Sequence, residues 1–588
     1  MAKLSYAEVN HLRNRLRDDM NKQLPKWELL ASFIAPERIK RDQAFNKNTG
    51  TRKDQKIIKN VAGRALRTFT SGMMNGATPR ARPWFNLTVT NQKKVGSTAA
   101  KRYFAECEAI LNNHFQISNL YRVLPMAYKD MGTFSNSAFA MLPHPKYGFY
   151  FYPFAIGTYA FATDMEGNPS MFTRDFSLNV RQVVETYAKK DNGGNIVWDN
   201  IPDYVKNYWE QAKYLEQVIL TMVIVPNREY DPVNSKRSLD PADKKYQSYT
   251  YIQSVGGNLP PQTSSGFRNE RSIGKEEFIK VSGFDYFPVI ISRWEVAPEE
   301  DYGVDGPGDI ALSDVMTLQT MEKYRLEAVA KMVKPPMVGH SSLRRHQASI
   351  LAGGITYVDD AGAAHGFKPA FELNPNLSHL IESQSEYQDA IRSAFFEDLF
   401  LMLSGEKTVS HVTAREIDEK SSERMAALAP VLGQLDQDQN SKIINNAMLI
   451  LEQAGKLPPR PRELEGEQLR PEYISILAQA SKVSMMNSIE RFSNFTSSMA
   501  NAHQDPTLLK LMNAEKAIRI YADYVAVDPA LVLDEDEFNS VKNAVRAEQA
   551  AQKQAMMQAQ GAQTAKDLSE AKTGEGSLLD TMLEAAQS

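Results

Sequence analysis

The sequence contains a single cysteine, Cys107, among 588 residues. One thiol cannot form an internal disulfide, and a structural zinc site built on thiolates needs several cysteines. We therefore expect the chain to fold in a reducing cytosol. No run of 18 apolar residues occurs and the first residues lack the apolar core of a signal peptide, so neither a membrane span nor a secretory leader is predicted.

Motifs that carry catalysis are also scarce. The sequence has no G-x-S-x-G and no H-E-x-x-H. Residues 405–408 (GEKT) only faintly resemble a phosphate-binding loop, because no glycine is directly next to the lysine and helical patterns lie on both sides. His340 and His346 lie among basic residues, and the acidic run 534–537 is interpreted as the start of a solvated helix rather than a cation site. We predict no catalytic residue, no metal, no cofactor and no enzyme activity.

Charge is nearly balanced over the whole chain but not along it. The formal net charge is −3, with 42% hydrophobic and 24% charged residues, which is typical of a soluble globular protein and excludes a polycation that coats nucleic acid. Residues 1–70 hold 16 Lys and Arg against 7 Asp and Glu, whereas residues 534–588 hold 5 against 10. This asymmetry predicts different partners at the two ends; the alternative is that both are solvated helix faces. The length predicts three or more substructures.

Two long helical patterns of similar length lie in the middle of the chain. The first covers residues 309–334, with Asp309 as its expected N-cap, and stops at Pro335 and Pro336. The second covers residues 377–403, and each would be about 40 Å long. A compact segment rich in glycine and proline joins them, and a polar loop at 404–411 leads to a third helix at 412–454 that stops at Gly455. Two matched helices with a small module at one end form a stalk, which suits a tube built from many copies.

The flanking regions predict a fold of the α+β class that is mainly helical. Ser5 and Glu8 form a capping box for a first helix that Pro25 should interrupt, and a further helix should end near Gly76. Short runs rich in β-branched and aromatic residues predict a mixed region with a largely antiparallel sheet; they are 138–142, 150–162, 171–176, 219–225, 249–254 and 287–292. Residues 470–545 are helical in pattern, and the Gln/Ala-rich end is expected to be a helix that frays into a tail.

The second long helix is acidic. It holds Glu382, Glu386, Asp389, Glu397 and Asp398 against Arg392 alone, a net charge of −4. Because proteins hold DNA mainly by Lys and Arg contacts with phosphates, an acidic tube would let DNA slide without sticking. Lys407 and His411 would then give brief contacts at a constriction. The alternative is an ordinary polar helix face with no DNA nearby.

Several blocks of sequence, in order along the chain, match one known family. They are residues 27–36 (WELLASFIAP), 62–74 (AGRALRTFTSGMM), 81–85 (ARPWF), Trp294 with 302–308 (YGVDGPG), 334–336 (KPP), 412–417 (VTAREI) and 455–459 (GKLPP). Through these blocks the chain resembles the portal, or head-to-tail connector, proteins of short-tailed bacteriophages. The likeness covers most of the length, and the joint order and spacing of the blocks make it specific.

The resemblance implies a ring-forming portal architecture with an α/β wing, paired long stem helices, a small α/β clip and a helical crown. The implied boundaries are 1–308 for the wing, 309–334 and 377–403 for the stem helices, 335–376 for the clip, 404–411 for a tunnel loop, 412–455 for a long wing helix, 456–545 for the crown and 546–588 for a C-terminal helix and tail. The loop would face DNA with Glu406, Lys407, Thr408 and His411, and the five acidic residues of the second stem helix would line the channel. Clip residues that contact the motor and the tail adaptor would be Arg344, Arg345, Gly353, Gly354 and Tyr357. The loop is short compared with the family's pattern.

The implied function is that of a ring, usually of twelve subunits, at one capsid vertex. Such a ring nucleates procapsid assembly, conducts double-stranded DNA during packaging and ejection, and binds the terminase motor and then the tail adaptor and tail proteins. Further expected partners are the major capsid and scaffolding proteins, with no membrane; the expected location is the virion, and the host cytoplasm during assembly. The basic residues Arg13, Arg15, Arg17 and Lys22 are predicted to contact neighbouring subunits or capsid. The alternatives are another ring-forming adaptor or collar protein, or a nucleic-acid-processing enzyme.

Overall fold

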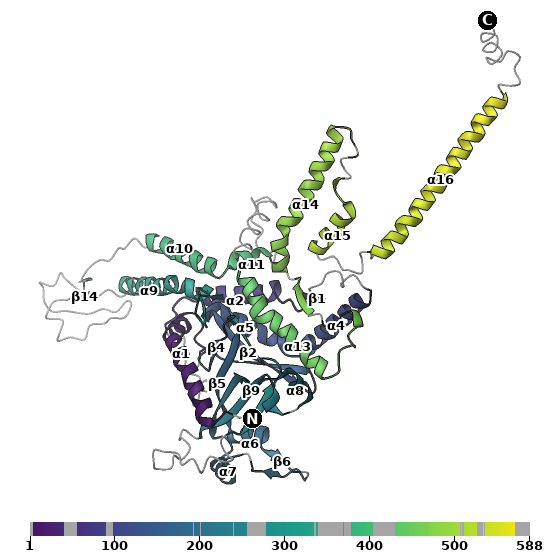
Figure 1. Ribbon diagram of the computed structural model, residues 1–588. Coiled ribbons are helices and arrows are strands. Elements are labelled where there is room, and N and C mark those ends of the chain that lie inside the picture. Colours follow the sequence, from purple (N-terminus) through teal and green to yellow (C-terminus); the bar gives the residue numbers. More distant parts are fainter. Residues whose placement is uncertain are drawn as a thin grey trace, which may run out of the picture. The chain divides into compact units, whose positions relative to one another are not determined.

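The computed structural model (Figure 1) describes most of the chain as two compact units, Met1–Ser481 and Lys482–Ser588, which are treated separately below. Outside the description lie residues 1–3, 40–55, 90–97, 192, 200, 239, 256–277, 334–336, 339–367, 370–377, 404–427, 429, 465, 467–468, 475, 506, 508–510, 526–532, 534 and 571–588. Much of the predicted clip and the whole predicted tunnel loop belong to these ranges.

The first helix, α1 (Tyr6–Phe33), begins as predicted. Ser5 accepts a hydrogen bond from the Glu8 amide while the Glu8 carboxylate accepts one from the Ser5 amide, so the capping box is confirmed. The predicted interruption at Pro25 is wrong, because the helix continues through it. Proline removes only one backbone donor, and the buried side chains of Met20 and Trp27 on either side hold both halves against the same core.

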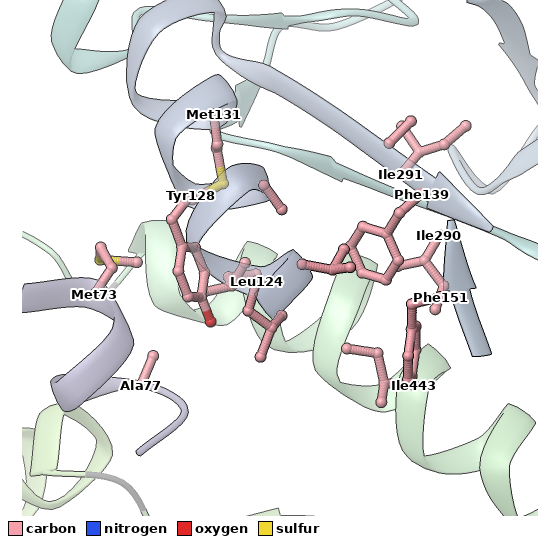
Figure 2. Close-up of a cluster of buried hydrophobic side chains, with 14 of the residues drawn as sticks. Met73, Ala77, Leu124, Tyr128, Met131, Phe139, Phe151, Ile290, Ile291 and Ile443 are labelled. Atoms are coloured by element: carbon pink, nitrogen blue, oxygen red, sulfur yellow. The ribbon is translucent and has the colours of Figure 1, made fainter. Parts of the chain in front are cut away.

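Helices α2 (Val61–Gly76), α4 (Thr98–Ile117) and α5 (Leu120–Phe134) follow. α2 ends where the sequence predicted. Figure 2 shows how α2 and α5 meet the strands and α13 (Ser441–Gln453) in one core. The labelled side chains are Met73, Ala77, Leu124, Tyr128, Met131, Phe139, Phe151, Ile290, Ile291 and Ile443.

Two antiparallel sheets make up the mixed region. The smaller has the order β11 (Val289–Arg293), β2 (Asn136–His144), β3 (Gly148–Pro153), and the larger β10 (Lys280–Phe284), β9 (Tyr246–Val255), β8 (Gln217–Pro226), β5 (Pro169–Asn179), β4 (Tyr159–Thr163). The antiparallel pairing was predicted. The prediction of one continuous run at 150–162 is wrong, because this segment divides into β3 and β4, which belong to different sheets. Gly157, at φ +84°, lies in the turn between them, where a glycine adopts the left-handed backbone without strain.

The five-stranded sheet is covered on both faces. On one face, Val9 of α1 packs with Val223, Val225, Tyr249 and Tyr251. The opposite face carries two separate clusters. Phe172 and Ile224 belong to the main core, whereas Val218, Leu220 and Ile252 pack under α6 (Val180–Tyr187) and α7 (Asp203–Glu210). The small hairpin β6 (Lys189–Lys190) and β7 (Ile196–Val197) lies between those two helices in the chain.

Shorter elements complete the first unit. They are α8 (Pro232–Arg237), η1 (Pro241–Asp243), the pair β12 (Glu295–Val296) and β13 (Gly303–Val304), and η5 (Arg462–Leu464). The predicted third helix is described only in its second half, where a π-helical turn, η4 (Asp436–Asn440), precedes α13. α13 ends before Gly455, at φ +65°, so the predicted stop is confirmed. The pairing of β16 (Leu469–Tyr473) with β1 (Phe85–Val89) was not predicted.

The second unit contains most of α14 (Ile476–Ala502), then α15 (Ala514–Val525) and α16 (Glu535–Glu570). Tyr521 of α15 donates a hydrogen bond to Glu490 of α14 at 2.8 Å, and Lys542 of α16 lies 3.4 Å from Glu515 of α15. α16 starts within the acidic run 534–537, as interpreted from the sequence, because carboxylates stabilise a helix N-terminus. Its regular helix extends through the Gln/Ala-rich segment to Glu570.

Candidate functional site

The first long helix of the stalk is α9 (Pro307–Val333), close to the predicted 309–334. Asp309 is not its N-cap, because the helix begins two residues earlier at Pro307, whose fixed φ suits the first helical position. Asp309 instead lies in the first turn, where it accepts a hydrogen bond from Ser135 Oγ at 2.6 Å and pairs with Lys26 at 2.9 Å. The start of α9 is therefore tied to α1 and to the end of α5.

The second long helix was predicted as one piece over 377–403, and this is wrong. α10 (Ser378–Ala394) ends at Phe395–Phe396, where Phe396 has φ +54°, and α11 (Glu397–Leu403) begins after it. The left-handed backbone at Phe396 ends the regular helix and changes the direction of the chain between α10 and α11. The break lets Phe395 approach Phe69 at 6.5 Å and Phe396 approach Trp294 at 6.2 Å between ring centroids.

The break is also fixed by a close contact with α2. Phe400 of α11 lies against Gly72 so tightly that a Cβ on Gly72 would be 2.0 Å from Phe400 Cγ. The Phe400 ring is 5.9 Å from that of Phe69 on the same helix. Only glycine fits at position 72, and α11 is therefore held directly on α2.

α9 and α10 lie side by side and project from the sheets (Figure 1), with their near ends fixed by polar contacts. Gln319 Oε1 accepts hydrogen bonds from the amides of Ile58 and Lys59 at 2.8 and 2.9 Å, and its Nε2 donates to the Lys59 carbonyl at 2.8 Å. Glu322, which is buried, pairs with Arg325 at 2.6 Å, and these contacts lower its pKa. Gln319 thus attaches α9 to the segment that leads into α2.

The far half of this α9/α10 pair exposes apolar side chains. The exposed fractions are 61% for Tyr324, 46% for Leu326, 43% for Met332, 73% for Val333 and 57% for Ile381. A patch of large apolar side chains on a projecting element marks an interaction surface. In the near half, by contrast, Ala311, Val315 and Leu318 are fully buried in the same subunit.

The five acidic residues predicted to line a channel do not share one environment. Glu382, Glu386 and Asp389 are exposed on α10, whereas Glu397 and Asp398 are half-buried in the first turn of α11. Arg392 lies 3.0 Å from Asp389 and 3.6 Å from Glu397, so part of the negative charge is compensated within the subunit. The break between α10 and α11 is what separates the two groups.

The predicted loop and clip residues lie outside the described part of the chain. This holds for Glu406, Lys407, Thr408 and His411, and for Arg344, Arg345, Gly353, Gly354 and Tyr357. The described residues of the predicted clip segment form a two-stranded pair, in which β14 (Met337–Val338) pairs antiparallel with β15 (Lys368–Pro369). The strand that follows α9 thus lies beside a strand that precedes α10.

The basic residues of α1 serve the subunit itself. Arg13 and Arg17 both bind the buried carboxylate of Asp175 on β5, the latter at 2.6 Å. Lys22 pairs with Asp19 on the same helix at 2.8 Å. Arg13, Arg17 and Lys22, three of the four residues predicted to contact neighbouring subunits or capsid, therefore have partners within the subunit. Their contact with neighbouring subunits or capsid stays a prediction.

A buried polar network was missed by the sequence reasoning. Arg293 of β11 and Asp438 of η4 have exposed side-chain fractions of 3% and 0%, with Nε–Oδ2 and Nη2–Oδ1 distances of 2.8 and 3.0 Å. Beside them, Ser292 donates to Gln439 at 2.8 Å, and Gln439 donates to Tyr128 of α5 at 3.3 Å. The only signal was a polar stretch, DQDQN at 436–440, inside an otherwise amphipathic helix. The π-turn brings these polar side chains to the core side.

Other features of a chemical site are absent where the chain is described. Among the residues outside the undescribed ranges, no three or more His, Cys, Asp or Glu side chains group in a way that could hold a metal ion. Within the same residues, no helix is both long and apolar enough to cross a membrane. The most prominent described feature of the candidate site is the projecting pair of α9 and α10.

Comparison with known proteins identifies the family of the chain. A family described as bacteriophage head to tail connecting protein matches residues 7–533. The chain belongs to this family. It is 32% identical over 561 residues to the portal protein of Salmonella phage epsilon15, covering 95% of this chain and 94% of that one. It is 28% identical over 565 residues to a probable portal protein of Bordetella phage BPP-1, covering 96% and 95%. The function is thus that of a phage portal or connector protein, and the resemblance seen in the sequence is confirmed.

Solved structures give a weaker likeness to this family member. The neck of an empty gene transfer agent (GTA) particle matches with a TM-score of 0.33 and 9% identity, over 74% of this chain and 86% of that one. The virion of a native GTA particle matches with a TM-score of 0.30 and 10% identity, over 73% and 94%. At such scores the likeness carries no argument about architecture, which rests here on the helices and sheets themselves.

Proposed function

We propose that this chain forms the ring at one capsid vertex through which phage DNA is packaged and ejected. The observation that carries the proposal is the match to portal proteins over nearly the full length of both chains. Copies would meet side to side through two different surfaces, and such heterologous contacts close into a ring when the rotation per copy permits it. Twelve copies are the number that the family resemblance implies.

In this ring, α9 with α10 and α11 would form the stem. The apolar side chains exposed on the far half, with Tyr324 and Val333 the most exposed, would be buried against the helices of adjacent copies. The exposed carboxylates Glu382, Glu386 and Asp389 would face the channel and repel the DNA backbone, so that the duplex slides rather than binds. Glu397 and Asp398, being half-buried, would contribute less to that lining.

We further propose that residues 335–376 form the clip, which contacts the terminase motor and later the tail adaptor. Support comes from the family resemblance and from the β14–β15 pair, which marks where the chain leaves and re-enters the helix pair. Removing residues 353–366 should leave rings that form but do not dock motor or tail. If such rings still package DNA and receive tails, the clip is elsewhere.

The remaining assignments follow the same resemblance. Residues 1–308 and 412–455 would form the wing that contacts capsid and scaffolding proteins. Residues 404–411 would form the tunnel loop, with Lys407 and His411 as candidate DNA contacts, and residues 456–545 would form the crown. The ring would be located in the virion and, during assembly, in the host cytoplasm, without a cofactor or a membrane. The family's structural role supports a protein without enzyme activity.

The decisive experiment is the native mass of the purified chain, measured by mass photometry, with negative-stain images of the same sample. Twelve copies of a 66.1 kDa chain (12 × 66.1) have a mass of about 793 kDa. A species of that mass with a central hole is expected. A neighbouring integer would change only the subunit number, whereas a monomer or dimer that persists at high concentration would refute a self-assembling ring.

A further inference from the structure

Arg174 is a largely buried cation that has no carboxylate partner among the described residues. It lies on β5, and its guanidinium stacks 4.1 Å from the ring centroid of Phe154 and 5.2 Å from that of Phe176. Its Nε is inaccessible to solvent and has no hydrogen-bond partner. The described residues place only the phenol of Tyr187 near enough to influence its charge. The next residue, Asp175, points to the opposite face and binds two arginines.

The position of Arg174 on the sheet explains why its side chain is only partly buried. On its face of the sheet, Phe172 two residues before it joins the main core, whereas Phe176 two residues after it packs with the cluster under α6 and α7. Arg174 therefore lies at the boundary between two hydrophobic clusters. The side chain keeps part of its surface exposed. A group from outside the subunit would have to approach Arg174 from that exposed part.

An uncompensated cation in such a place destabilises the isolated subunit. Burial lowers the pKa of Arg174 to about 10, so the group is still charged at neutral pH. Removing a charge from water without a counter-ion is costly, and a bidentate carboxylate is the partner whose geometry fits the planar guanidinium fork. The flanking rings exclude water and strengthen that pairing.

We propose that Arg174 is the receptor for a carboxylate side chain of a neighbouring copy of this chain. The inference rests on the proposed ring, in which each copy presents a second surface to its neighbour. A nucleic-acid phosphate fits less well, because backbone binding uses several exposed cations in succession. The next cation on the same cross-strand row, after Met222 and Thr250, is Lys280, three strands and roughly 14 Å away.

The test is assembly of the full chain with Arg174→Met, which keeps the apolar contact with Phe154 and removes the charge. Ring and free-subunit fractions are measured by sedimentation velocity across a concentration series. The expected result is that about tenfold more subunit is needed for the same ring yield. The subunit's own melting temperature, measured below the assembly threshold, should be unchanged or higher, because a buried unpaired charge has been removed. Arg174→Lys, which keeps the charge but not the fork, should assemble at an intermediate concentration.

The matched control is Arg181→Met on α6, which makes the same charge change at an exposed residue paired with Glu185 at 2.7 Å. It should assemble like the wild type. Equal ring yield for Arg174→Met and wild type overturns the proposal, as does a loss of assembly that comes with a lower melting temperature, which would make Arg174 structural. Loss of binding to short duplex DNA with unchanged ring yield would overturn it in favour of a phosphate. If the wild type itself forms no ring, the proposed function fails first.

Discussion

Asp438→Asn should destabilise the core around β11 and η4 more than any surface change does. The substitution keeps the shape of the side chain but leaves Arg293, which is 3% exposed, without its counter-ion. It also removes the carboxylate that lies 3.8 Å from the largely buried Lys442 and accepts a hydrogen bond from Gln434 at 3.0 Å. Breaking a buried pair by removing one partner costs about 3–5 kcal/mol. Because asparagine still offers one acceptor oxygen to Arg293, we expect about 3 kcal/mol.

The assay is urea unfolding followed by tryptophan fluorescence, at subunit concentrations below assembly. Trp294, one of five tryptophans, is 3% exposed and adjacent to Arg293, so part of the fluorescence change reports this part of the core. The double variant Arg293→Met with Asp438→Leu should recover most of the loss, to within about 2 kcal/mol of the wild type, because an apolar pair can replace a buried ion pair. The residual loss comes from the missing Arg293 hydrogen bond to the Gly167 carbonyl at 2.8 Å and from Lys442 and Gln434, which lose the Asp438 carboxylate.

The control is Glu210→Gln, at an exposed pair 3.9 Å from Lys206, which should not measurably shift the transition. Two results would refute the reasoning about the network. One is a loss below about 1 kcal/mol for Asp438→Asn, which would mean that water reaches the pair. The other is a double variant as unstable as the sum of its single variants, since that would show no coupling between the two residues.

Three further predictions concern other parts of the subunit. Tyr324→Glu on the exposed far half of α9 should reduce ring yield at least tenfold with an unchanged subunit melting temperature, and equal yields in sedimentation would exclude this face as an interface. Glu108→Gln should stabilise the subunit by about 1 kcal/mol above pH 7 and not near pH 4. Burial raises the pKa of Glu108 to about 7 in the folded state, so the stability contribution of its protonated form is lost as the pH rises from 4.5 through 7. Parallel pH profiles of the melting temperature for the variant and the wild type would contradict this. Gly72→Ala should cost about 2–3 kcal/mol, because its Cβ would overlap Phe400, and Gly561→Ala on α16, where a Cβ meets nothing within 4 Å, is the matched control.

The parts of the fold that sequence could predict are those where one local signal dominates. The capping box at Ser5 and Glu8 and the stop at Gly455 follow from backbone groups within a few residues, and both are present. The break at Phe396 could not be predicted locally, because a run of apolar residues fits one continuous helix. Its cause lies in Phe69 and Trp294, which are far away in sequence.

The same distinction applies to the functional residues. The acidic character of 377–403 could be read from composition, but which carboxylates share a face depended on the break between α10 and α11. The positive charge of residues 1–70 suggested an external partner, whereas Arg13 and Arg17 meet Asp175 on a strand about 160 residues later. Neither the positive charge of Arg174 nor the strand pattern around it indicated that no carboxylate among the described residues would pair with its side chain. Partners of charged residues are set by tertiary contacts, which composition does not contain.

α9 and α11 are both anchored at α2, α9 just before its first residue and α11 near its last. Gln319 of α9 binds the backbone of residues 58 and 59 just before α2 begins, and Phe400 of α11 is fitted against Gly72 near its end. α2 in turn packs on α5, and Figure 2 shows Met73 and Ala77 beside Tyr128 in that core. Because packed cores do not deform continuously, a displacement of either long helix must move α2 as a body or break one of these two contacts. α2 is therefore one route by which a force on the projecting helix pair reaches the sheets, beside the contacts of Asp309 with Ser135 and Lys26.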